Sequence, residues 1–307
     1  MTWFRRPPGR LSGLLLAAGA SAALIACDSS EGIGTGDLTL RVSGEGAAKV
    51  GYPYEKNGAL LAFGDDWSIS FDKFLVSLGQ VELRASDGAE AVASTDTFIA
   101  DLHRGDPVFG RYEGLDARRW DRLSFRILPP DGATINLNDV AAEDIERMRA
   151  GGFNYWIEGS ATLDEMTYTF AWGLANPTRN SSCSNGLDGT DGLVVRTNST
   201  TEAEITIHVD HLFWDTLGSE IAAMRFTPIA AASTDDTHVD FEELAGQLLS
   251  DLRDIGGEPL QDGEGQRIVY NPGAVPIGEP NLMEFVLASA ASAGHVNGLG
   301  LCTVSAL

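Results

Sequence analysis

The sequence predicts a mainly β fold, a β-sandwich with a few peripheral helices in the C-terminal half. Short stretches of alternating apolar and polar residues follow one another through the first two thirds of the chain, with glycine-containing turns between most of them. Helical spacing is rare, and two of the three stretches that show it lie after residue 239. A strand-rich order with late helices is typical of two packed sheets with helical decorations.

The strand pattern is clearest between residues 67 and 83. Its apolar parity changes near Lys73, from Ile69 and Phe71 to Phe74, and such a change predicts a bulge or a bend. The expected strands are 38–42, 67–83, 97–102, 120–128, 153–163, 166–174, 192–196 and 203–209.

Three segments have helical spacing and are expected to form helices. The strongest pattern places Phe241, Leu244 and Leu248 on one face, as an amphipathic helix does. The expected helices are 138–150, which starts at an Asn and stops at Gly151, 240–255 and 281–293, and residues 256–278 are expected to form a loop.

The N-terminus has the layout of an export signal. Three arginines give a positive start, and an apolar stretch of about 15 residues follows, shorter than the roughly 20 that span a membrane. The stretch ends in residues 24–27 (LIAC), the pattern of a lipobox, in which the cysteine sulfur takes a diacylglycerol. Residues 1–26 are therefore predicted to be a lipoprotein signal peptide, with Cys27 as the lipidated first residue of the mature chain.

The mature chain is expected to be held in the cell envelope by its lipid. Residues 27–36 are polar and glycine-rich, which is typical of a flexible tether, and residues 37–307 suffice for one sizeable core. We expect a single β-sandwich domain with a helical C-terminal extension. Its anchor lies in the outer or the inner membrane, and the domain faces the periplasm or the cell surface.

The predicted mature chain is strongly acidic. Removal of residues 1–26 takes away three arginines and no acidic residue, so the formal charge moves from −23 to −26. This composition argues against nucleic acid as a partner, because phosphate binding needs a basic face. Cations are the partners that such a surface attracts, and solubility alone is the alternative explanation.

Two cysteines remain when Cys27 carries the lipid. Cys183 and Cys302 form an even pair in an oxidising compartment, which favours a disulfide. The bridge would close a loop of about 120 residues and contribute about 4 kcal/mol in the chain-entropy model. Two free thiols are the alternative.

The most suggestive chemical cluster is the segment 208–215 (HVDHLFWD). His208 and Asp210 point to one face at the end of a strand, and His211 reaches them if a helix begins there. The alternative is a strand-to-helix corner in which Asp210 caps the helix and His208 is hydrogen-bonded in or near the core. Imidazole with carboxylate suits zinc or copper, so the candidate ligands are His208, Asp210, His211 and Asp215.

A second acidic segment, residues 232–243, resembles an EF-hand calcium loop. Asp236 would be at position 5, Asp240 at position 9 and Glu243 at the bidentate position 12. The acid of position 1 and the glycine of position 6 are missing. The alternative is a capped helix start, where acidic residues are favoured.

A third acidic segment, the glycine-rich residues 185–192, offers Asp188 and Asp191 to calcium. The alternative is a turn-rich loop held by Cys183. His103 and His295 are isolated in the sequence. Known enzyme motifs are missing, with no GxSxG elbow, HExxH pair or Walker loop, so the chain is expected not to be an enzyme.

Several segments occur in an order that is found in a known family. The segment 152–159 (GFNYWIEG) has many aromatic residues and ends in Glu-Gly, and the others are 71–83, 110–112 with 120–127, and 170–183. In this order and spacing the chain resembles the MbnP-like family, the methanobactin-associated periplasmic proteins, over roughly residues 37–217. The resemblance implies a β-sandwich envelope protein, with copper handling in some relatives. Where that family often has His-Leu-Gly, this chain has Ala171-Trp172-Gly173-Leu174.

The expected function is that of a lipid-anchored, non-catalytic binding protein of the cell envelope that handles a metal ion, with copper, zinc and calcium as candidates. The alternative is a structural lipoprotein that docks another envelope protein and holds no metal. Metal content separates the two.

Overall fold

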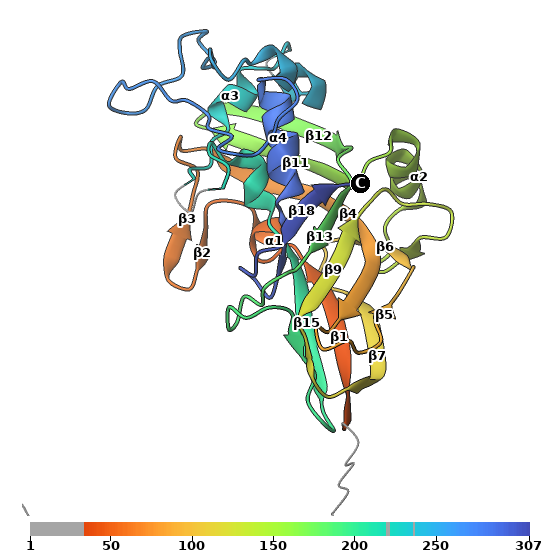
Figure 1. The fold of residues 1–307 in the computed structure, drawn as a ribbon. Helices are drawn as coiled ribbons and strands as arrows, with labels where there is room; N and C mark the ends of the chain where they lie inside the picture. Colours follow the sequence, from red (N-terminus) through yellow and green to blue (C-terminus); the bar gives the residue numbers. More distant parts are fainter. Residues whose placement is uncertain (1–33, 219–221, 236) are drawn as a thin grey trace, which may run out of the picture. The chain divides into compact units, whose positions relative to one another are not determined.

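Strands make up most of the regular structure in the described residues, 34–218, 222–235 and 237–307 of the computed structural model (Figure 1). Within these residues there are two main sheets, of four and ten strands, and two small ribbons. Apolar side chains of both main sheets enter one core, so the expected mainly β, sandwich-like fold is confirmed. The described residues form one compact unit. The predicted signal peptide, Cys27 and most of the predicted tether lie outside the described residues.

The smaller sheet is built around β1 (Thr35–Ser43). β1 pairs in parallel with β15 (Thr200–Ile207) and antiparallel with β7 (Val108–Asp116), and β17 (Gly294–Val296) extends the sheet beyond β15. The alternating apolar residues of β1 that predicted a strand are all buried on the core side. The sequence did not predict β7 or β17.

The larger sheet is centred on its longest strand, β4 (Ser68–Arg84). β11 (Tyr155–Leu163) and β9 (Arg122–Ile127) flank it in antiparallel pairing, and β12 (Met166–Leu174) forms a hairpin with β11. The other strands of this sheet are β5 (Val92–Ala93), β6 (Thr97–Asp101), β10 (Ile135–Asn136), β13 (Thr178–Ser181), β16 (His238–Val239) and β18 (Thr303–Ala306); the ribbons pair β2 (Tyr54–Lys56) with β3 (Ala59–Leu61) and β8 (Arg119–Trp120) with β14 (Leu193–Val194).

The predicted irregularity in β4 is a bulge. Lys73 pairs with Glu158 of β11, whereas the next residue of β11, Gly159, pairs with Phe71, so Asp72 has no partner across the ladder. The extra residue restores the alternation, and the apolar residues on both sides of it reach the same core.

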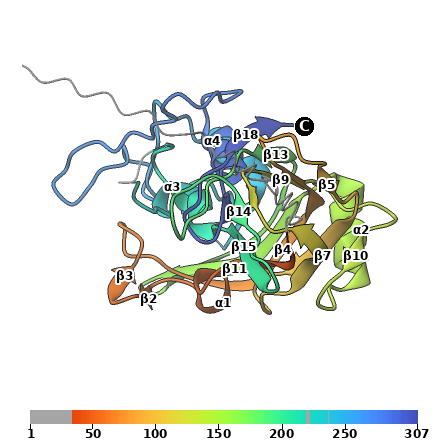
Figure 2. The same ribbon diagram turned by 60° about the horizontal axis from the view of Figure 1, so that its bottom comes forward.

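A second, small apolar cluster packs beneath α2 (Ala142–Gly151). Leu75 points away from the main core, because successive residues of a strand face opposite sides of the sheet, and it belongs to a cluster with Ile99 and Met148. Lys73 adds an ion pair across the same contact, with its Nζ 3.0 Å from Asp144 Oδ2. Both views show α2 apart from α4 (Leu282–Ala291), which belongs to the main core (Figure 2).

Two of the three predicted helices are confirmed. α4 begins where predicted, and the Asn281 side chain caps it by accepting from the Glu284 N–H at 3.0 Å. α2 begins later than predicted, because Asn138 bonds the backbone of Asp101 instead of capping the helix. The remaining helices are α1 (Ala47–Val50), α3 (Thr227–Ala230) and the 3-10 helices η1 (Val209–Phe213) and η2 (Phe241–Gly246). None of the helices in the described residues is long and apolar enough to cross a membrane.

The predicted helix 240–255 is wrong beyond η2. Gly246 ends the helical part, and glycine costs about 1 kcal/mol in a helix interior. The backbone after Gly246 makes hydrogen bonds with residues further along the chain instead of the i to i−4 bonds of a helix. The Leu249 N–H donates to the Pro280 carbonyl, and the Leu260 N–H donates to the Leu252 carbonyl, both at 2.9 Å. These bonds to distant residues replace the bonds of a continuous helix.

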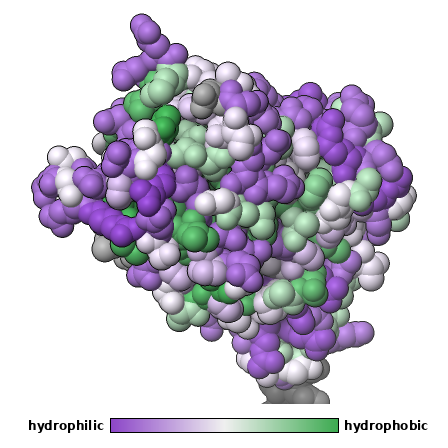
Figure 3. All heavy atoms as spheres, turned by 90° about the horizontal axis from the view of Figure 1, so that it is seen from above, coloured by the Kyte–Doolittle hydropathy of each residue, from purple (hydrophilic) through white to green (hydrophobic). Residues whose placement is uncertain are grey.

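The surface seen from above is largely hydrophilic, with apolar residues in small separate groups (Figure 3). This view agrees with the solvated surface that the composition predicts.

The predicted disulfide between Cys183 and Cys302 is confirmed. It joins the segment after β13 to the segment before β18, and these two strands pair antiparallel beside it. The bridge therefore fixes the C-terminal end of the chain to the edge of the larger sheet.

Replacement of both bridged cysteines by serine should lower the free energy of unfolding by about 3–5 kcal/mol, because the unfolded chain regains the freedom of a long loop. Urea denaturation measures the change. Reduced wild-type protein serves as the control and should match the variant. A loss below about 1 kcal/mol would contradict the stabilising role.

Candidate metal centre

Two paired strands of the smaller sheet bring distant histidines together. His208 follows the last residue of β15 and opens η1, which carries His211. β17 places His295 opposite Thr206 of β15. Since residues 206 and 208 lie on the same side of an extended chain, His208 and His295 are diagonal neighbours on one face.

The three imidazoles form a compact, buried group. The ring centres of His208 and His295 lie 4.5 Å apart, and the ring of His211 lies 5.5 Å from the first and 5.2 Å from the second. Each of the three residues is at most 7% exposed. The Trp214 ring packs against His211, with ring centres 3.6 Å apart and the planes tilted by 31°.

Two carboxylates approach the histidines. Asp210 Oδ1 lies 3.6 Å from His208 Nδ1, and one ligand atom each of His208, Asp210 and His211 lie within 4.8 Å of one another. Glu45, from the turn after β1, brings Oε2 to 3.9 Å from the same His208 nitrogen. The group therefore combines imidazole nitrogens with carboxylate oxygens, which suits a transition-metal ion.

Hydrogen bonds fix which nitrogen of each ring carries the proton. A carbonyl oxygen can only accept, so His208 Nε2 donates to the Gly298 carbonyl at 2.8 Å, and His295 Nε2 donates to the Ser292 carbonyl at 3.1 Å. The Ser292 hydroxyl gives its proton to the Ser289 carbonyl, so its Oγ accepts from His211 Nδ1 at 2.9 Å.

The opposite nitrogen of each ring is therefore unprotonated in the neutral imidazole. His295 Nδ1 is buried and has no hydrogen-bond partner. Metal-binding histidines have this arrangement, in which one nitrogen is oriented by a protein acceptor and the other holds the ion.

Burial keeps two of the rings neutral. It lowers the pKa of His211 to about 3 and that of His295 to about 4, with the neighbouring His208 charge adding to the effect on His295. Burial also opposes the charged form of His208, but the neighbouring Asp210 carboxylate and the Gly298 carbonyl outweigh it and raise the pKa of His208. At neutral pH at least two imidazoles are thus ready to bind a metal without losing a proton.

The structure brings together three of the four ligands predicted in the segment 208–215. Asp215 lies apart, because its carboxylate accepts from Arg225 Nε at 2.9 Å and from the Ala223 N–H at 3.0 Å. His295 and Glu45 were not predicted. His295 approaches because β15 pairs with β17, and Glu45 approaches because of the turn after β1. No local pattern in the sequence predicts this strand pairing or the position of this turn.

The EF-hand-like segment follows the capped-helix alternative in its described part. Glu243 Oε2 accepts from the Asp240 N–H at 3.0 Å, and its Oε1 accepts from the Thr234 N–H at 3.1 Å. Both oxygens are thus engaged at the start of η2. Asp236 lies outside the described residues.

The acidic loop 185–192 follows the turn alternative. The Asp188 carboxylate accepts from the Thr190 N–H at 3.0 Å, and the Asn185 side chain accepts from the Leu187 N–H at 3.0 Å. These local bonds and the nearby disulfide account for the composition of the loop.

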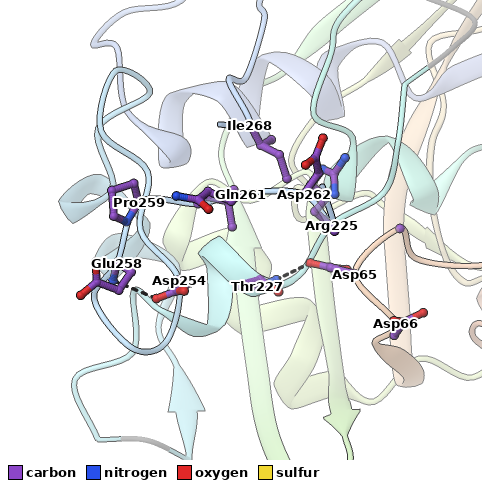
Figure 4. A pocket seen from close by; sticks show the side chains of 13 residues that line it. Asp65, Asp66, Arg225, Thr227, Asp254, Glu258, Pro259, Gln261, Asp262 and Ile268 are labelled. Atoms are coloured by element: carbon purple, nitrogen blue, oxygen red, sulfur yellow. Dashed lines mark hydrogen bonds between the residues drawn. The ribbon is translucent and has the colours of Figure 1, made fainter. Parts of the chain in front are cut away.

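A separate hollow lies between the start of α3 and the loop of residues 254–268 (Figure 4). Its volume is about 570 Å³, and acidic side chains, Asp65 and Asp254 among them, line it around Arg225. Asp65 Oδ2 accepts from the N–H groups of Phe226 and Thr227, so this carboxylate serves the first turn of α3. The hollow is lined by no histidine and by none of the candidate metal ligands.

Comparison of the chain with family models, with curated proteins and with solved structures gives no match.

In metal-free protein, folding stability should fall as the pH falls below about 6.5. The folded states of His211 and His295 take up protons near pH 3 and 4, whereas the unfolded chain does so near 6.5, so the unfolded state holds more protons in between. His208 acts in the opposite sense, since its raised pKa stabilises the fold at low pH and this contribution is lost as the pH rises through the folded value. Because two histidine pKa values are lowered and one is raised, the fold loses stability overall as the pH falls.

Urea denaturation in a chelator from pH 7 to pH 4.5 measures this slope. His211→Asn/His295→Asn should flatten the profile, because the two groups no longer titrate. A variant profile as steep as that of the wild type would contradict the prediction.

Proposed function

We propose that this chain is a lipid-anchored protein of the cell envelope that binds one transition-metal ion, zinc or copper, without catalytic turnover. Its ligands are His208, His211, His295 and Asp210. One observation carries the proposal: each imidazole hydrogen-bonds a protein acceptor through one nitrogen, so that in the neutral ring the other nitrogen is free for an ion within the same buried group.

The donor set favours zinc or copper over calcium. Calcium takes six to eight oxygen ligands, whereas this group offers three imidazoles and few carboxylates. In the two acidic segments considered for calcium, the carboxylates of Asp188 and Glu243 are engaged in local hydrogen bonds. Metal handling at the histidines is therefore the better account.

The burial of the group supports binding over turnover. Catalytic metal sites keep an open position for water and substrate, whereas the rings here are at most 7% exposed. Asp210 lies beside His208, and Trp214 packs against His211. Such enclosure suits an ion that is held, not one that meets a substrate.

The envelope location rests on residues 1–27, and the disulfide between Cys183 and Cys302 fits an oxidising compartment. The resemblance to the MbnP-like family agrees with an envelope protein that handles copper. The histidines proposed here differ from the His-Leu-Gly element of that family, which this chain replaces at Ala171–Leu174.

A docking module is the second candidate. Leu187, Leu299 and Leu301 are 67–79% exposed, and their two loops adjoin, since the Ser184 N–H donates to the Leu301 carbonyl at 2.8 Å. Exposed leucines on joined loops favour contact with another protein. Partner binding that survives a chelator and is lost on Leu299→Asp/Leu301→Asp would support this candidate.

Soluble mature protein that lacks Cys27 should bind one zinc or copper ion per chain, measured by elemental analysis and competitive titration. His208→Ala/His211→Ala should weaken binding by more than the roughly 10–100-fold that the loss of an outer-shell partner costs. His238→Ala, which removes an imidazole near the surface and outside the group, is the matched control. A well-folded wild-type protein that binds none of these ions tightly would contradict the metal proposal.

In bacteria that express the full chain, labelled palmitate should enter the protein, and Cys27→Ala should abolish the label, because the acyl chains are carried by that cysteine. Ser29→Ala is the control and should leave labelling unchanged. Label that persists in Cys27→Ala would disprove anchoring at this residue.

A further inference from the structure

Glu45 faces the candidate metal centre from a different part of the chain. It lies in the turn between β1 and α1, and its Oε2 is 3.9 Å from His208 Nδ1. Its φ of 55° is a left-handed value that glycine adopts freely and a side chain adopts at a cost. Gly44 and Gly46 flank it, so the turn carries a carboxylate at the very position where a third glycine would be easiest.

Lys56 holds this carboxylate. Its ammonium group, from β2, pairs with Glu45 Oε2, the same oxygen that approaches His208. The Lys56 side chain is 37% exposed, whereas that of Glu45 is 20% exposed. The lysine can therefore turn to solvent while the carboxylate stays beside the histidines.

The charges of this group match a divalent ion. With neutral imidazoles, Asp210 and Glu45 bring two negative charges to the same His208 nitrogen, at 3.6 and 3.9 Å. A divalent ion neutralises both. A monovalent ion that takes the place of the Lys56 ammonium at Glu45 leaves one of these negative charges unneutralised in a partly buried place, which is unfavourable.

The types of donor atom also favour a divalent ion. The only described cysteines are joined in the disulfide, so imidazole nitrogen and carboxylate oxygen remain as donors, and these suit Zn²⁺. Monovalent copper prefers the sulfur of cysteine or methionine.

We infer that Glu45 is a further ligand that makes the centre selective for a divalent ion of the zinc class over monovalent copper, with Lys56 as its counter-ion when no metal is bound. This inference rests on the proposed metal binding and names the ion class of that same site. The metal replaces the Lys56 ammonium at Glu45 Oε2, and the three imidazoles and Asp210 complete the ligand set.

The test compares Zn²⁺ and Cu⁺ affinities of the soluble mature protein by competition with chromophoric chelators, without oxygen for Cu⁺. Glu45→Gln keeps the shape of the side chain and removes its charge. It should lower the Zn²⁺ affinity about tenfold or more and the Cu⁺ affinity by less than about threefold, in line with the loss of one charged ligand. Glu55→Gln, on the exposed side of the same hairpin, removes the same charge and should change neither affinity.

Lys56→Met provides a second variant that leaves the turn of Glu45 intact. It removes the competing ammonium group, so the Zn²⁺ affinity should rise while the Cu⁺ affinity stays nearly constant. A wild type that binds both ions, with an affinity ratio that neither variant changes, overturns the inference alone. A wild type that binds neither ion overturns the proposed function as well.

Discussion

The pairing of β15 with β17 is the constraint on which the candidate metal centre depends. It sets Thr206 opposite His295, and this register puts His295 next to His208 on the same face. A shift by one residue would turn His295 to the other face. The register is held from outside as well, because the Gly186 N–H donates to the Val296 carbonyl at 3.0 Å and the disulfide lies in the next loop. The covalent bridge and the metal ligands thus belong to one connected region.

The same region explains why an ion would stabilise the fold. A buried acceptor without a donor costs about 1–3 kcal/mol, and His295 Nδ1 is such an acceptor. The outer hydrogen bonds to Gly298 and Ser292 hold the rings in place at that cost. An ion would satisfy the unprotonated nitrogens and would, by mass action, favour the folded chain. Geometry that is unfavourable for an empty centre becomes favourable for an occupied one.

Local features of this chain could be predicted from the sequence, and long-range features could not. The bulge at Asp72, the helix α4 and the bond between Cys183 and Cys302 follow from a parity change, a helical spacing and a count of cysteines. His208, Asp210 and His211 could be grouped because they are close in sequence. His295 and Glu45 could not, since strand register and turn position decide their approach. The prediction of a helix over residues 247–255 was wrong for a related reason, because backbone hydrogen bonds to distant residues outweigh a helical pattern in the sequence.

X-ray absorption spectroscopy of the zinc-loaded protein tests the central claim most directly, because it reports which atoms surround the ion. The account predicts nitrogen and oxygen neighbours at about 2.0–2.2 Å, with the outer-shell signal of three imidazoles. That signal should fall to two imidazoles in His295→Ala. A sulfur neighbour at about 2.3 Å, or a spectrum without imidazole signal, would contradict the account.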